Sequence, residues 1–273
     1  MRKNIVELIQ AMNVDISQEY KKLWELFYNG NSYEDTLYCV INENFTKLHF
    51  AGITIDIDEF DKACGFNFLN KRSIKNDEID YYISFCEYLY NIFVYGNMID
   101  EATYNFDINF WLTHIGKVID ILNYKIINKN NMFIIVEKSP QAIAVSEIVD
   151  DQLSISTLEY NHFTMKGDLT RKKETLIKFY NYLEPKRKNL LELDNKLSNL
   201  LFEAMNKCNI RHNNVDPGSK NHINIVAEMN NDKLEIIYDD LYQLCLLSIL
   251  LLDNKGRKNT IEELLKSLKN KNM

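Results

Sequence analysis

The segment LLELDNKLSNLLFEAMNKCNIRHNNVDPG, residues 190–218, holds a strongly patterned helix and the polar loop that ends it. Apolar residues recur every three or four positions between residues 190 and 208, which is typical of an amphipathic helix. The apolar stripe is wide enough to contact two neighbouring helices. We therefore expect a helix over about 186–208 inside a helical bundle. The apolar positions are Leu190, Leu193, Leu197, Leu200, Leu201, Ala204 and Cys208.

The loop that follows, residues 209–218 with His222 beyond it, brings an arginine, histidines and asparagines close together in the chain. Asn, Pro and Gly stop helices, so one interpretation is a helix end at which Arg211 and His212 bind the last carbonyl groups. A second interpretation is a phosphodiester site. A histidine, with an ordinary pKa of about 6.5, can act as a base, and an arginine can bind phosphate oxygens.

Composition narrows the class of protein. Eight Gly and three Pro in 273 residues favour long helices over an all-β architecture. A net charge of −7 disfavours a general nucleic-acid-binding surface. The five cysteines lack metal-like spacing, and the longest apolar run, residues 244–252, is shorter than the roughly 20 residues needed to span a bilayer. We expect a cytoplasmic protein with no metal, no cofactor and no membrane partner.

The fold class expected from these patterns is mainly α, with at most a minor short β element. We expect a helical N-terminal region over residues 1–128 and a helical bundle over 129–273. Residues 52–59 fit a short strand or an extended connector, and residues 132–136 fit a strand. Besides 186–208, the expected helices are about 4–12, 16–29, 33–48, 77–95, 107–127, 140–150, 169–183, 233–252 (capped by Asp232 and Glu235) and a last one capped by Thr260 and Glu263.

A long helix, an arginine followed by a polar residue, a loop and a final long helix resemble the HEPN domain (higher eukaryotes and prokaryotes nucleotide-binding) over about residues 139–253. Arg211 matches the signature arginine and His212 its polar position. The chain departs from the signature further on. Asp216 stands at the commonest place of the downstream histidine, and His222 comes eleven residues after Arg211.

Many HEPN proteins are metal-independent ribonucleases of toxin–antitoxin, abortive-infection and CRISPR systems, and they typically dimerise with their motifs facing each other. The resemblance implies an RNA-directed effector in a bacterial antiviral defence or toxin system, with a homodimer formed through the C-terminal bundle. It further implies RNA and a cognate antitoxin or defence protein as partners. The implied catalytic residues of such an endoribonuclease are Arg211, His212 and His222.

A basic run between residues 166 and 188 would contact RNA if it lies beside Arg211. The alternative is a solvated helix face. Two other interpretations of the protein's function remain. One is a catalytically inactive HEPN-like module for dimerisation or partner binding, and the other is a helical scaffold in which Arg211 and His212 only cap a helix. The expected RNA-binding residues are Lys172, Lys173, Arg187, Lys188, Asn213 and Asn214.

Overall fold

The computed structural model describes residues 14–29, 36–48, 51–96 and 107–271, which form α-helices and one two-stranded sheet. The expected fold class, mainly α with a minor β element, is confirmed. The chain divides into two compact units, Met1–Val136 and Glu137–Met273. The helix expected at 4–12 lies outside the described residues. Within them, no helix combines the length and the apolar character needed to cross a bilayer.

Side-chain caps start the helices of the first unit. Asp15, Thr36, Asp56 and Asp107 each accept a hydrogen bond from a backbone N–H of the following turn. Residues 52–59, expected as a strand or connector, are a turn that leads into a helix capped by Asp56. The elements are α2 (Ile16–Tyr28), α3 (Leu37–Glu43), η1 (Phe45–Lys47), α4 (Ile57–Cys64), α5 (Ile79–Gly96), α6 (Ile108–Ile121), β1 (Tyr124–Lys129) and β2 (Met132–Glu137).

Buried aromatic rings form the core of the first unit. The ring centroids of Tyr20 and Phe68 each lie 4.9 Å from that of Phe85. Two aromatic side chains of α2 also bind backbone carbonyls through their polar groups. The Tyr20 hydroxyl donates to the Lys71 carbonyl at 2.6 Å, and Trp24 Nε1 donates to the Phe68 carbonyl at 2.9 Å. These bonds hold α2 against the segment between α4 and α5.

Strands β1 and β2 form a hairpin, and β1 begins inside the helix that was expected over 107–127. The helix predicted over 107–127 stops at Ile121, and Asn123 adopts a left-handed backbone conformation with φ of 66°. Asparagine tolerates that conformation better than most residues, so it ends the helix and turns the chain into β1. Side chains of α5 bind the backbone of β2: Asn91 exchanges two hydrogen bonds with Phe133, at 2.7 and 2.8 Å, and so supports a hairpin that would be marginal alone.

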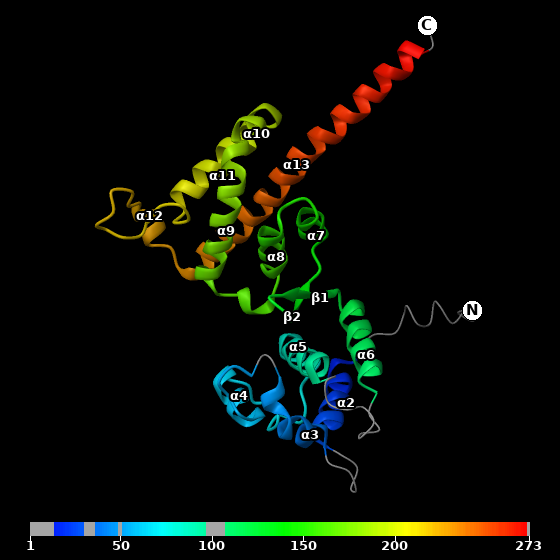
Figure 1. The fold of residues 1–273 in the computed structure, drawn as a ribbon. Helices are drawn as coiled ribbons and strands as arrows, with labels where there is room; N and C mark the ends of the chain where they lie inside the picture. Colours follow the sequence, from blue (N-terminus) through cyan, green and yellow to red (C-terminus); the bar gives the residue numbers. More distant parts are fainter. Residues whose placement is uncertain (1–13, 30–35, 49–50, 97–106, 272–273) are drawn as a thin grey trace, which may run out of the picture. The chain divides into compact units, whose positions relative to one another are not determined.

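After Glu137, the last residue of β2, the regular elements described in the second unit are helices (Figure 1). The helix expected over 169–183 forms with those bounds, whereas the helix expected over 186–208 is two helices. Asp194 has extended backbone angles, and its carboxylate accepts from the Leu197 N–H at 2.9 Å, so it starts a new helix inside the apolar stripe. The elements are α7 (Pro140–Ser146), α8 (Asp151–Glu159), η2 (Phe163–Met165), α9 (Leu169–Leu183), η3 (Glu184–Lys186), α10 (Arg187–Leu193), α11 (Asn195–Lys207), α12 (Asn224–Ala227) and α13 (Asn231–Lys271).

Helix α13 is one continuous helix of 41 residues where two helices were expected. Its first turn is capped by Asn230, whose side chain accepts from the Lys233 N–H at 2.9 Å. The Thr260 hydroxyl donates to the Gly256 carbonyl at 3.2 Å inside the helix and therefore does not start a new one. In Figure 1 the helix runs from orange to red past α10 and α11. Its buried core residues are Leu234, Tyr238, Leu241, Tyr242, Cys245, Leu246, Ser248 and Ile249.

The buried carboxyl group of Asp61 should make the stability of the protein depend on pH. Burial, together with the nearby charge of Asp58, raises the pKa of Asp61 to about 6. The folded protein therefore keeps a proton that the unfolded chain loses, and the free energy of unfolding falls as pH rises from about 4 to about 6. We expect Asp61→Asn to be more stable than wild type at pH 7.5 by up to about 3 kcal/mol, with the difference shrinking towards pH 4.

Urea denaturation at the two pH values measures this effect. Asp77→Asn provides the control, because it removes an exposed carboxyl group and should change stability at pH 7.5 by less than about 0.5 kcal/mol. An Asp61→Asn variant that is no more stable than wild type at pH 7.5 would contradict the expectation.

Candidate functional site

The candidate site lies in the loop that connects α11 to α13. Helix α11 ends at Lys207 with Cys208 as its C-cap, and Asn209 follows in the left-handed conformation with φ of 59°. The backbone N–H of Arg211 then donates to the Met205 carbonyl at 3.0 Å. The last turn of the helix is therefore bound by the Arg211 backbone, which leaves the guanidinium for other contacts.

Two asparagine side chains fix the start of this loop. Asn214 is buried, and its Oδ1 accepts from the Asn209 N–H at 2.9 Å, while the Asn214 N–H donates to Asn209 Oδ1 at 3.3 Å. Asn214 Nδ2 also donates to the Asn221 carbonyl at 2.7 Å. A buried amide with its groups paired in this way holds the backbone in one conformation. Asn214, which was expected to contact RNA, is used inside the loop.

The loop folds back on itself after Asn214. The Ser219 N–H donates to the Asp216 carbonyl at 2.9 Å, and the Ile223 N–H donates to the Asn214 carbonyl at 2.9 Å. This turn brings the backbone of Ile223 back to Asn214. The Nδ1 atom of His222 is buried and has no hydrogen-bond partner within the described ranges, an unusual state for a buried polar atom.

The Arg211 side chain lies against the C-terminal part of α9. Its guanidinium carbon is 4.9 Å from the centroid of the Tyr180 ring, a cation–π arrangement. Its polar contacts are long: Nη1 lies 3.4 Å from Asn206 Oδ1 and Nη2 lies 3.8 Å from Glu184 Oε1. The side chain is 44% exposed and borders a recess of about 150 Å³. Arg211 is therefore oriented by an aromatic ring while most of its donors stay open.

Glu184 places a negative charge at the same recess. Its Oε1 accepts from the Tyr180 hydroxyl at 2.6 Å, and burial together with this hydrogen bond raises the pKa of Tyr180. The tyrosine therefore stays protonated and orients the carboxylate. Neither Tyr180 nor Glu184 was singled out from the sequence, because a spacing of four residues at the end of a helix is ordinary.

The basic run divides into buried, paired and exposed side chains. Lys172 is buried, and its Nζ lies 2.7 Å from both Glu235 Oε1 and Asp239 Oδ1 on α13. The Tyr160 hydroxyl also donates to Asp239, at 2.9 Å. Lys172 thus joins α9 to α13 and presents no charge to a ligand at the surface.

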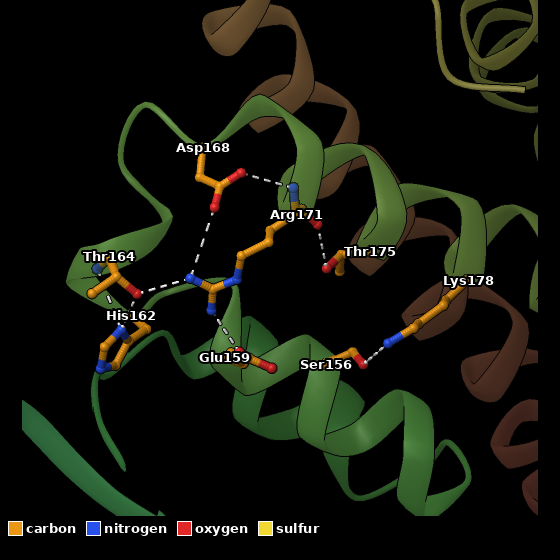
Figure 2. Close-up of polar contacts among 8 residues, drawn as sticks. All are labelled: Ser156, Glu159, His162, Thr164, Asp168, Arg171, Thr175 and Lys178. Atoms are coloured by element: carbon orange, nitrogen blue, oxygen red, sulfur yellow. Dashed lines mark hydrogen bonds and ion pairs between the residues drawn. The ribbon is translucent and has the colours of Figure 1, made fainter. Parts of the chain in front are cut away.

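Two other basic residues of α9 contact groups on α8 and η2 (Figure 2). Arg171 Nη2 lies 2.7 Å from Glu159 Oε1, and its Nη1 donates to Thr164 Oγ1 at 3.0 Å. Lys178 Nζ donates to Ser156 Oγ at 2.8 Å. Arg171 is therefore paired with a carboxylate within the unit, as Lys172 is, and Lys178 is bound to a neutral hydroxyl.

The remaining predicted RNA-binding residues lie in two places. Arg187 and Lys188 are exposed at the start of α10, with the Arg187 guanidinium 4.8 Å from the Phe202 ring centroid. Lys173 Nζ lies 3.4 Å from Asn209 Oδ1, and burial lowers the pKa of this lysine. Lys173 is thus the member of the run that contacts the Arg211 loop. Asn213 is exposed in that loop, and its Oδ1 accepts from the Asp216 N–H at 3.2 Å.

Comparison with family models, curated proteins and solved structures finds no match to this chain. Among the described residues, no group of three or more His, Cys, Asp or Glu side chains has the arrangement of a metal site.

We expect the Asn214 amide to be a main stabilising contact of the loop. Replacing Asn214 by Ala leaves the Asn209 N–H and the Asn221 carbonyl without their partners, which should lower the free energy of unfolding by about 1–3 kcal/mol. Urea denaturation measures the loss, and hydrogen exchange should rise in residues 208–223. Asn213→Ala is the matched control, because that exposed side chain makes one local bond. Equal effects of the two substitutions would contradict this role.

A second expectation separates structural lysines from surface lysines. Lys172→Met should lower the free energy of unfolding by about 1–3 kcal/mol, because two carboxylates lose their cation. Since the hydrogen bond from Lys172 lowers the pKa of Glu235, the advantage of the wild type should fade as pH drops below 4.5. The exposed Lys188, changed to Met, should alter stability by less than about 0.5 kcal/mol in the same denaturation experiment. Similar losses of unfolding free energy in Lys172→Met and Lys188→Met would contradict a structural role for Lys172.

Proposed function

We propose that the second unit is a HEPN-like, RNA-directed effector that cleaves RNA without a metal ion, in a bacterial defence or toxin system. The observation that carries the proposal is the state of Arg211. Its guanidinium is half exposed, lies over Tyr180, and makes only long polar contacts within the described residues. A planar cation held in this way can bind two phosphate oxygens at once.

Cleavage of RNA through its own 2′-hydroxyl requires a base, an acid and a fixed cation. A histidine removes the proton of the RNA 2′-hydroxyl, whose oxygen attacks the adjacent phosphorus. The bond from phosphorus to the 5′-oxygen breaks, and this oxygen takes a proton from the acid. The products are a 2′,3′-cyclic phosphate and a free 5′-hydroxyl. Arg211 stabilises the charge on the phosphoryl oxygens during this step.

His212 and His222 are the imidazoles available in the Arg211 loop. His212 follows Arg211 directly and is partly buried, and the return of the loop after Asn214 supports a role for His222. In this proposal His212 is the base and His222 the acid. Lys173, next to Asn209, and the exposed Arg187 and Lys188 would bind the flanking phosphates.

A second candidate is an inactive HEPN-like module that binds a partner or dimerises. Two observations favour it: the Glu184 carboxylate lies 3.8 Å from Arg211 Nη2, and Asp216 stands where the signature histidine is expected. Both are negative charges that repel phosphate. Such a module would use Arg211 to bind a carboxylate or phosphate of a partner and would leave RNA intact.

Cleavage of total RNA and of a labelled single-stranded RNA by the purified protein, with EDTA present, tests the proposal. We expect cyclic phosphate ends and a loss of about 100-fold or more in the cleavage rate for Arg211→Ala. His212→Ala should slow cleavage more than His222→Ala, because the base acts on the weakly acidic 2′-hydroxyl. Arg72→Ala is a matched control, since Arg72 also lies over an aromatic ring, 5.4 Å from the Trp24 centroid, but in the first unit.

The other outcomes are equally specific. RNA binding that weakens with salt and with Arg211→Ala, but without any cleavage, would favour the inactive module. Cleavage that stops in EDTA would overturn the metal-independent mechanism. Undiminished cleavage by Arg211→Ala, with melting temperatures unchanged, would move the site away from this loop.

A further inference from the structure

Glu184 is a charged group beside Arg211 that phosphate cleavage does not use. We call the cavity of about 150 Å³ that it borders the Arg211 recess, which is lined by Ile177, Tyr180, Asn181, Glu184 and Arg211. A carboxylate repels phosphate, so its place in this recess points to a different chemical group of the ligand. The recess is smaller than the roughly 300–1,000 Å³ of sites that enclose a drug-sized ligand. It therefore suits one planar base and not a whole nucleotide.

Glu184 and Arg211 lie side by side, and one aromatic side chain orients both. Glu184 Oε1 accepts from the Tyr180 hydroxyl at 2.6 Å, and the Arg211 guanidinium carbon lies 4.9 Å from the centroid of the Tyr180 ring. The distance from Arg211 Nη2 to Glu184 Oε1 is 3.8 Å, which is longer than a hydrogen bond. The recess therefore presents an oriented donor next to an oriented acceptor, and neither group saturates the other.

Guanine is the RNA base whose Watson–Crick edge fits this pair of groups. That edge carries the acceptor O6 followed by two donors, N1–H and N2–H, and a protein reads such an edge by hydrogen bonds. A carboxylate accepts from two donors at once, and a guanidinium donates to the adjacent acceptor. Adenine and cytosine each place a ring-nitrogen acceptor beside their amino group, where it would face the carboxylate. Uracil offers a single N–H between two carbonyls.

The rest of α9 agrees with a nucleotide at this place. Lys173, Ile177 and Tyr180 are spaced by four and three positions and so share one face of the helix. That face meets the Arg211 loop at two points: Lys173 Nζ lies 3.4 Å from Asn209 Oδ1, and Tyr180 lies beneath Arg211. The apolar Ile177 lies between the two cations and lines the recess. A strand with one base in the recess therefore has cations for its phosphates and an apolar wall for the base.

We propose that the Arg211 recess reads a guanine base of single-stranded RNA. Glu184 accepts from the N1–H and N2–H groups of the base, and Arg211 Nη2 donates to its O6. The other donors of Arg211 bind the scissile phosphate, so the guanine belongs to one of the two nucleotides that this phosphate joins. Tyr180 is a positioning residue, since its hydroxyl acts through Glu184. This inference rests on the proposed function, because it takes RNA as the ligand of the Arg211 loop.

Binding to RNA that cannot be cleaved tests the base preference separately from catalysis. Oligouridylates with 2′-fluoro groups in place of the hydroxyls, and with one central guanosine, adenosine or inosine, lack the attacking oxygen. Fluorescence anisotropy with the full-length protein gives their dissociation constants. We expect the guanosine RNA to bind about 10-fold or more tightly than the adenosine RNA. The inosine RNA should lie between them, because inosine lacks the N2 amino group.

Glu184→Gln tests the residue that reads the base. A glutamine amide accepts one hydrogen bond and donates another, which suits adenine better than guanine, so the preference for guanosine should fall by about 10-fold or reverse. Tyr180→Phe keeps the ring beneath Arg211 but removes the hydroxyl that orients Glu184, and it should also lower the preference. Glu203→Gln is the matched control and should keep the wild-type preference. Glu203 is likewise exposed and paired, 2.6 Å from Lys207 Nζ, but lies outside the recess.

Free guanosine 3′-monophosphate, used as a competitor, distinguishes an RNA strand from a single nucleotide. It should bind about 10-fold or more weakly than the guanosine RNA, because it lacks the neighbouring phosphates that Lys173 would bind. Equal affinity of the mononucleotide and the RNA would overturn an RNA strand as the occupant of the recess.

Mapping of the cut positions in an RNA of mixed sequence separates this inference from the proposed function. Guanosine preference in binding without any cleavage would support the base reading and contradict the ribonuclease. Cleavage with no enrichment of guanine on either side of the cut would overturn the base reading alone. Equal binding of guanosine and adenosine RNA, or an unchanged preference in Glu184→Gln, would also overturn it, and an absence of RNA binding would overturn both. Circular dichroism checks each variant, and if Glu184→Gln loses helix, the three RNAs on the wild type decide.

Discussion

The buried ammonium group of Lys172 is the interaction on which the arrangement of the second unit most depends. A charge removed from water is costly unless it is paired, and Lys172 is paired with Glu235 and Asp239 at 2.7 Å each. These bonds fix α9 against α13. Both helices flank the Arg211 loop: α9 supplies Tyr180 beneath the guanidinium, and the loop leads into α13. The position of Arg211 therefore rests on an ion pair at the other end of α9.

The start of the Arg211 loop is fixed by the side-chain amides of two asparagines. Asn209 and Asn214 exchange hydrogen bonds across the start of the loop, and Asn214 also binds its returning end. A loop of this length without regular structure needs such bonds, since its backbone groups have no helix or sheet to satisfy them. The stretch in which arginine, histidine and asparagine gather therefore serves two purposes. The asparagines stabilise the loop, and the Arg211 guanidinium makes only long polar contacts within the described residues.

How far the sequence predicts this structure depends on whether a signal is local. Helix α9 was predicted with its observed bounds because its apolar spacing is regular. The break at Asp194 was missed because the apolar stripe continues across it, and α8 was missed although Asp150 is a typical cap. In the candidate site, too, only the features that are local in the sequence could be predicted. The gathering of Arg211 and His212 is visible in the chain, but the burial of Lys172 depends on carboxylates more than sixty residues away.

The continuity of α13 shows how tertiary contacts and local bonds compete. Asn254 and Gly256 are residues at which helices often end, and a glycine inside a helix costs about 1 kcal/mol relative to alanine. The pair of Asp253 with Arg257 and the bond from Thr260 to Gly256 act across this weak point and favour continuation. Each of these contributes only a few tenths of a kcal/mol, and an isolated helix as short as residues 256–268 is marginal in water. Residues 256–268 are therefore stabilised as an extension of a helix whose earlier turns are anchored in the core.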